Sequence, residues 1–129
     1  MTAYLADTHA LLWWVFDDKR LSKRARALMA DRGHTILVSS ASAWEIATKW
    51  RLGKLPKAAV FVQDIPGWIA KAGFDELPVS IAHGQRAGTW PQEHRDPFDR
   101  MLAAQSSIEG VAIISSDDAF EEFGVPMVW

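Results

Sequence analysis

Four acidic residues that lie far apart in the sequence are the side chains best suited to chemistry: Asp7, Glu45, Asp99 and Asp117. Carboxylates gathered in one place raise one another's pKa, and a shared divalent cation relieves that repulsion. Carboxylate oxygens are preferred ligands of Mg²⁺ and Mn²⁺, and Mg²⁺ commonly bridges protein carboxylates and a substrate phosphate. Such a set, with one or two bound cations, is suited to hydrolysing a phosphodiester bond.

The elements that must position these acids alternate between short apolar strands and helices. Apolar and β-branched runs predict strands at 4–6, 35–38, 77–79 and 111–114, and allow an edge strand at 127–129. Helical patterns occupy 8–16, 21–30, 39–53, 58–72 with an interruption at Pro66 and Gly67, 80–88, 97–109 and 117–123. This alternation predicts an α/β fold with a parallel sheet covered on both faces.

Composition narrows the class of protein. The chain of 129 residues is 49% hydrophobic and shows no repeat or linker, so we expect a single domain over 1–129. Having no cysteine, it cannot form a disulfide framework, a thiolate zinc site or a cysteine nucleophile. Neither a secretory signal nor an apolar run of roughly 20 residues is visible, so we expect a soluble, cytoplasmic protein. The net charge of −2 disfavours a passive nucleic-acid-binding module, and seven tryptophans favour a stable partner surface.

Parallel topology places the four acids at one edge of the sheet. Asp7 follows the first predicted strand, and Asp117 follows the fourth after two serines. Glu45 lies in the first turns of the helix that leaves the second strand, and Asp99 lies near the start of a helix that runs antiparallel to the fourth strand. Ligands of such sheets bind at the carboxyl ends of the strands. Whether the acids also meet sideways depends on the strand order, which the sequence leaves open.

Each acid also has a structural interpretation. Asp7 can cap the helix that follows it, and Glu45 can be a first-turn acid favoured by the helix dipole, although its neighbours Trp44 and Ile46 are apolar. Either Asp117 or Asp118 can cap the last helix. These alternatives remain open beside the metal-binding one.

The segment 94–100 contains two acids with different predicted roles. Asp96 precedes Pro97, and an acid followed by proline is typical of a helix cap and the first helical position. Asp99 comes three residues later and can face the same side. We therefore assign Asp96 mainly to capping, with a supporting role at the site still open, and Asp99 to metal binding.

Four motifs in this order resemble those of the PIN-domain family, and more narrowly the VapC-type toxins of bacterial toxin–antitoxin pairs. The motifs are DTHALLWW from Asp7, SAWEIATK from Ser42, HRDPFDRMLAAQ from His94 and SSD from Ser115. The third is the most specific, and the resemblance extends over essentially the whole chain.

The resemblance implies a three-layer α/β/α sandwich with a short, mostly parallel sheet. It further implies a Mg²⁺- or Mn²⁺-dependent endoribonuclease that acts on RNA and is inhibited by a cognate antitoxin. We also expect a homodimer. The family's metal acids match Asp7, Glu45, Asp99 and Asp117, while Thr8 and Ser115 match hydroxyl residues beside them. Asp96 and Asp118 are alternative acids next to two of these positions, so the site is better defined than its exact ligands.

Positive charge near the acids would hold the phosphates of a substrate. The candidates are Arg95, Arg100, Lys49 and Arg51, with Lys54 and Lys57 further away. A salt bridge from Arg100 to Asp96 or Glu93 is an equal alternative, and a solvated side chain is favoured for Lys49. We assign no catalytic role to His9 or His94. Trp13, Trp14 and the basic helix at 21–31 can form the dimer or antitoxin surface, although core packing is an equal alternative for one of the tryptophans.

Three other interpretations compete with a nuclease. A phospho-acceptor receiver domain would need paired acids after the first strand and a lysine after the last, and neither is present. An Asp-x-Asp phosphatase is excluded because position 9 is histidine. A degenerate PIN-like domain that only binds RNA or protein is disfavoured because all four acids are present.

Overall fold

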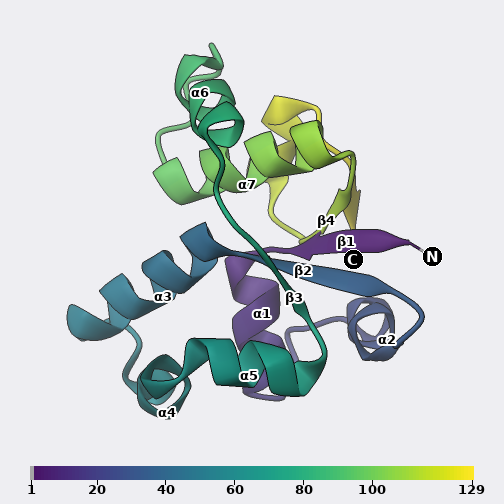
Figure 1. The fold of residues 1–129 in the computed structure, drawn as a ribbon, viewed down its shortest axis with the longest axis vertical. Coiled ribbons are helices and arrows are strands. Elements are labelled where there is room, and N and C mark those ends of the chain that lie inside the picture. The colour runs from purple at the N-terminus through teal and green to yellow at the C-terminus, as the bar shows by residue number, and fades with distance from the viewer. Residues whose placement is uncertain (1) are drawn as a thin grey trace.

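The centre of the fold is a sheet of short parallel strands. The computed structural model describes residues 2–129, and within that range five strands form one sheet in the order β3-β2-β1-β4-β5 (Figure 1). All neighbouring strands run parallel. The strands are β1 (Ala3–Ala6), β2 (Thr35–Ser39), β3 (Asp75–Leu77), β4 (Ala112–Ile114) and β5 (Met127–Val128).

Helices cover both faces of this sheet, as the sequence predicts. They are α1 (Thr8–Val15), α2 (Lys23–Ala30), α3 (Ser40–Arg51), α4 (Ala59–Gln63), α5 (Ile65–Ala72), α6 (Ile81–Thr89) and α7 (Pro97–Glu109), with 3₁₀ turns η1 (Pro56–Ala58) and η2 (Asp118–Phe123). Figure 1 shows α6 and α7 on one side of the sheet and α1 to α5 on the other. The fold is therefore the expected three-layer α/β/α sandwich.

The two faces of the sheet have separate cores because side chains alternate along each strand. In β1, Ala6 joins a core with residues of α1 to α5, whereas its neighbour Leu5 joins the opposite core with Leu102 and Phe120. In β4, Ile114 and Ile113 divide in the same way. The apolar strand sequences thus reflect burial on both sides.

The third strand lies two residues earlier than the prediction of 77–79. β3 pairs with β2 through Asp75, Glu76 and Leu77. Pro78 lacks the N–H that a ladder needs, so the strand ends before it. The sequence pattern did not predict a strand at Asp75 and Glu76 because both are charged. Such charges are common on edge strands because they discourage pairing with another chain.

The predicted interruption at Pro66 and Gly67 is also displaced. The helical segment breaks at Asp64, whose φ of −155° and ψ of 66° leave the helical region. Asp64 Oδ1 accepts a hydrogen bond of 3.0 Å from Gly67 N, and Pro66 lies in the first turn of α5. Proline is tolerated there because the first N–H groups of a helix have no partner within the helix.

The strand order settles how the acid-bearing loops lie relative to one another. β1 is central, with β2 on one side and β4 on the other. The chain therefore leaves the carboxyl ends of β1 and β4 in different directions, which is the arrangement that opens a crevice between them. Across residues 2–129, no helix is both long and apolar enough to cross a membrane.

The cap at Asp64 gives a stability prediction. Asp64→Ala leaves the first turn of α5 without its acceptor and should lower the free energy of unfolding by about 0.5–2 kcal/mol. Asp64→Asn keeps a capping oxygen and should stay close to the wild-type value. Urea denaturation measures both, and equal stability of the alanine and asparagine variants would contradict the assigned cap.

Candidate metal-dependent active site

Three of the predicted acids lie at the edge formed by the ends of β1 and β4. Asp7 follows β1, Asp117 follows β4, and Asp99 lies in the first turn of α7. Burial is the main cause that raises the pKa of Asp7 and of Asp99, and the negative charge of Asp117 adds a smaller contribution to both. Asp117 is therefore near enough to act on each of the other two carboxyl groups.

Asp7 is both a helix cap and a buried acid. Its carboxyl group is 5% exposed, and its Oδ1 accepts a hydrogen bond of 2.6 Å from Ala10 N at the start of α1. Burial raises the pKa of this carboxyl from 3.8 to about 6, although hydrogen bonds from Ser115 and Ala10 act in the opposite direction. The capping interpretation is therefore correct and is compatible with a role at the site.

Glu45 lies on the first turns of α3 and is joined to the residue beside Asp7. The Thr8 hydroxyl donates a hydrogen bond of 2.7 Å to Glu45 Oε1 and lies 3.0 Å from Ser42 Oγ. The other oxygen, Oε2, accepts from Lys49 Nζ at 2.6 Å. The expectation of a solvated Lys49 is thus wrong. Glu45 is buried, and an ammonium group one turn away offsets the cost of its charge.

Asp99 contacts His94, a residue to which the sequence analysis assigned no catalytic role. His94 Nε2 lies 2.9 Å from Asp99 Oδ2. Partial burial raises the pKa of Asp99, while the hydrogen bond to His94 lowers it. Asp96 caps α7, because its Oδ1 accepts from Phe98 N and Asp99 N at 2.9 and 3.3 Å. The cap predicted for Asp96 is therefore present, and the metal role of Asp99 stays a prediction.

The two acids of the last motif, Asp117 and Asp118, also have different structural roles. Asp117 caps η2 through a hydrogen bond of 2.9 Å from Ala119 N to its Oδ1, while Asp118 is an exposed first residue of that turn. Ser115 is buried, accepts a hydrogen bond from Asp117 N at 2.9 Å and bonds to the Asp7 side chain. This serine therefore connects the ends of β1 and β4.

The basic candidates differ in what they can offer a substrate. Arg95 is exposed beside the site, whereas the guanidinium of Arg100 faces backbone carbonyls and forms no salt bridge with Asp96 or Glu93. Lys54 and Lys57 line a cleft of about 650 Å³ together with Trp13. The two lysines thus lie close to α1, and among residues 2–129 neither forms a salt bridge with one of the four predicted metal acids.

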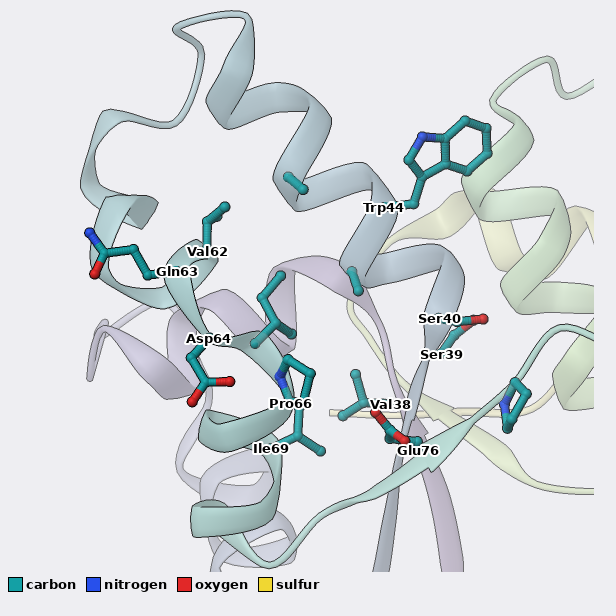
Figure 2. Close-up of a pocket in the computed structure, with 14 residues that line it drawn as sticks. Val38, Ser39, Ser40, Trp44, Val62, Gln63, Asp64, Pro66, Ile69 and Glu76 are labelled. Carbon is teal, nitrogen blue, oxygen red and sulfur yellow. The ribbon is translucent and has the colours of Figure 1, made fainter.

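A second hollow, of about 500 Å³, lies away from the candidate acids. It is bounded by α3, the α4–α5 turn and β3, and Figure 2 shows Val38, Ile69 and Pro66 facing it, with Trp44 beside it. None of the four predicted metal acids lines it. Trp13 and Trp14, proposed from the sequence as a partner surface, are both half-buried, packing against Trp129 and Phe74 respectively.

The chemistry of the acid set suits a hard divalent cation. Every predicted ligand offers oxygen, and two of the carboxyls have a raised pKa because burial and like charge disfavour their ionised forms. Within residues 2–129, however, no three acidic or histidine side chains converge closely enough to form a ready-made cation site. The donors fit Mg²⁺ or Mn²⁺ in kind, but a bound cation would require the side chains to move closer together.

A model of the PIN domain matches residues 4–126. The chain belongs to the PIN-domain family. This PIN domain is 35% identical over 88 residues to Ribonuclease VapC16 of Mycobacterium tuberculosis, an alignment covering 54% of this chain and 62% of that relative. The chain thus spans less than two thirds of the length of the curated relative it matches.

Solved structures share the fold of this PIN domain at low sequence identity. VapBC2 from Rickettsia felis bound to a promoter DNA fragment has a TM-score of 0.72 and 13% identity, with 98% of each chain covered. A toxin–antitoxin complex from Klebsiella pneumoniae has a TM-score of 0.66 and 19% identity, with 98% of this chain and 96% of that chain covered. These likenesses confirm the predicted fold class.

The raised pKa of Asp7 predicts how stability depends on pH. The folded PIN domain holds the Asp7 proton more tightly than the unfolded chain, so the stabilising contribution is complete below about pH 4 and is lost as the pH rises through about 6. Asp7→Asn keeps a capping oxygen and removes the charge. It should therefore raise the free energy of unfolding at pH 8 by up to about 3 kcal/mol, with the gain vanishing near pH 4. Urea denaturation in EDTA measures this difference. A gain of the same size at both pH values would contradict it.

Asp96 and Asp99 can be separated by their effects on metal binding. Asp99→Asn should weaken Mn²⁺ binding at least tenfold in calorimetry, because it replaces a predicted ligand. Asp96→Asn keeps the helix cap and should change the affinity less than threefold. A larger loss at Asp96 would reverse the two assignments.

Proposed function

We propose that this PIN domain is a divalent-metal-dependent endoribonuclease that cleaves phosphodiester bonds in RNA and acts as the toxin of a toxin–antitoxin pair. The observation that carries the proposal is the position of three acids at one carboxyl edge of the sheet: Asp7 directly after β1, Asp117 after β4 and Asp99 in the first turn of α7. Family membership agrees with it, as does a relative named as a ribonuclease. The receiver-domain alternative lapses because the chain is a PIN domain.

In this proposal Asp7, Glu45, Asp99 and Asp117 hold Mg²⁺ or Mn²⁺. When bound, such a cation supplies a water of lowered pKa and stabilises negative charge on the phosphate. The chain's own groups then fix the ligands: Ser115 and the Ala10 N–H hold Asp7, and the Thr8 hydroxyl holds Glu45. A fixed carboxylate loses less conformational freedom when it binds a cation, and this favours affinity.

Two groups can supply positive charge for the substrate. Lys49 Nζ donates a hydrogen bond of 2.6 Å to Glu45 Oε2, so its ammonium group is next to one of the predicted ligands. Arg95 is exposed in the segment that precedes α7. Both can contact phosphates that flank the scissile bond, and such contacts hold RNA without reading its sequence.

The partners follow from the proposed role. We expect a cognate antitoxin protein that covers this PIN domain, a homodimer of the chain and a cytoplasmic setting. Its structural neighbours include VapBC2 from Rickettsia felis and a toxin–antitoxin complex from Klebsiella pneumoniae, which supports the expectation of an antitoxin.

Cleavage of RNA by the purified, antitoxin-free protein tests the function. Wild type should cut a mixed single-stranded RNA with Mg²⁺ or Mn²⁺, stop in EDTA and recover when the cation is restored. Asp7→Asn should lower the cleavage rate at least 100-fold, because it removes one predicted ligand and its charge. Asp64→Asn, which changes a remote acid in the same way, should cut at the wild-type rate.

Two outcomes would contradict the proposal in different ways. Equal cutting by wild type and Asp7→Asn would indicate a contaminating nuclease or another mechanism. RNA binding by wild type without cutting under any of the metal conditions would favour the degenerate, non-catalytic PIN-like module.

A further inference from the structure

All three nitrogens of the Arg100 guanidinium donate to backbone carbonyls. Its Nε donates to Ala87 O at 2.8 Å, and Nη2 donates to Trp90 O at 2.6 Å. Its Nη1 donates to Gln92 O at 2.7 Å and to His94 O at 2.9 Å. Among residues 2–129 no acidic side chain forms a salt bridge with it. The charge is therefore committed to one segment of main chain.

That segment needs such a partner. The last carbonyls of a helix lack N–H partners within it. In α6, the Trp90 N–H bonds back to Arg86 O, Arg100 is the donor to Ala87 O, and the chain from 90 to 96 forms no regular element. The negative end of the α6 dipole favours a cation, and Arg100 meets it from the first turn of α7. The rings of Trp90 and His94 pack against Phe123, with centroids 5.0 and 5.9 Å from it. Arg100 Cζ lies 5.7 Å from the same ring.

The 90–95 segment in turn holds the ring of His94 against Asp99, which is a predicted metal ligand. Arg100 binds the main-chain oxygen of His94, and the His94 ring lies 2.9 Å from Asp99 Oδ2. Asp99 and Arg100 are neighbours on α7. The start of α7 therefore contacts His94 twice, through Arg100 at its main-chain oxygen and through Asp99 at its ring. Asp96, which follows the 90–95 segment, is itself fixed because it caps α7.

We propose that Arg100 is a positioning residue, which holds the 90–95 segment so that His94 fixes the Asp99 carboxylate beside Asp117. This inference rests on the proposed function, because it assigns Asp99 to a bound cation. Partners that orient a ligand carboxylate commonly contribute 10–100-fold to metal affinity. Lysine cannot replace Arg100, since one ammonium group cannot reach four carbonyls spread over the fork of a guanidinium.

The experiment uses the full chain and Mn²⁺ as the probe. The variants are Arg100→Lys, His94→Ala, their double variant and Arg86→Lys as the matched control. Arg86 is exposed and donates to Ser107 Oγ at 2.8 Å, so it also joins α6 to α7. Its guanidinium lies 6.0 Å from the Trp90 ring but bonds to none of the segment's carbonyls, so this control separates a side-chain contact with the segment from the carbonyl bonds. Calorimetry gives the Mn²⁺ affinity, and amide hydrogen exchange of the metal-free protein reports on residues 90–95.

We expect a specific pattern across these variants. Arg100→Lys should speed exchange in 90–95 at least tenfold and weaken Mn²⁺ binding 10–100-fold, and His94→Ala should weaken binding to a similar degree. Because both act on one contact, the double variant should be within about threefold of the weaker single variant. Arg86→Lys should bind Mn²⁺ like wild type.

Other outcomes would overturn the inference or the function separately. If wild type binds Mn²⁺ and both single variants bind it equally well, Arg100 has only a structural role. Multiplying effects in the double variant would show that Arg100 does not act through His94. If Arg100→Lys fails to fold, unchanged affinity in His94→Ala is enough to overturn the inference. A wild-type protein that binds no Mn²⁺ contradicts the proposed function instead.

Discussion

The burial of a carboxyl group at the end of the central strand is the constraint on which the rest of this structure depends. Asp7 follows β1, is 5% exposed and is more easily protonated than an ordinary aspartate. The fold tolerates it because an N–H of α1 and the Ser115 hydroxyl both bond to it. Removing such a group from water is costly unless hydrogen bonds or an opposite charge compensate. The neighbouring strand ends and helix starts are arranged around that need.

The same edge combines negative side chains with the positive ends of helices. Asp7, Ser39 and Asp96 cap α1, α3 and α7, so three helices begin close to the carboxyl ends of the strands. Helix starts attract anions, and the caps satisfy only part of their free N–H groups. Lys49 and His94 add donors directly to Glu45 and Asp99. Helix starts and side-chain donors thus bring positive charge to an edge that is rich in acids.

Much of this arrangement was predictable from the sequence, because it follows from local patterns. Apolar runs located β1, β2 and β4, and acids after them marked one edge of the sheet. Asp96 followed by Pro97 gave the start of α7. The strand order and the position of β3 were not predictable, since both depend on contacts between distant segments. The pairing of Lys49 was predictable in principle, because Glu45 and Lys49 have the i, i+4 spacing that favours an ion pair on a helix, but a solvated lysine was preferred. The role of Arg100 was missed because main-chain carbonyls leave no trace in a sequence.

The double duty of Asp7 has an evolutionary consequence. A cap made by asparagine keeps the start of α1 intact while removing a poorly solvated charge. Mutational drift at this position would thus tend toward a sturdier protein with an impaired site, a common conflict between durability and activity. An aspartate kept here across generations would be a sign that selection acts on what the residue does rather than on how well the chain folds.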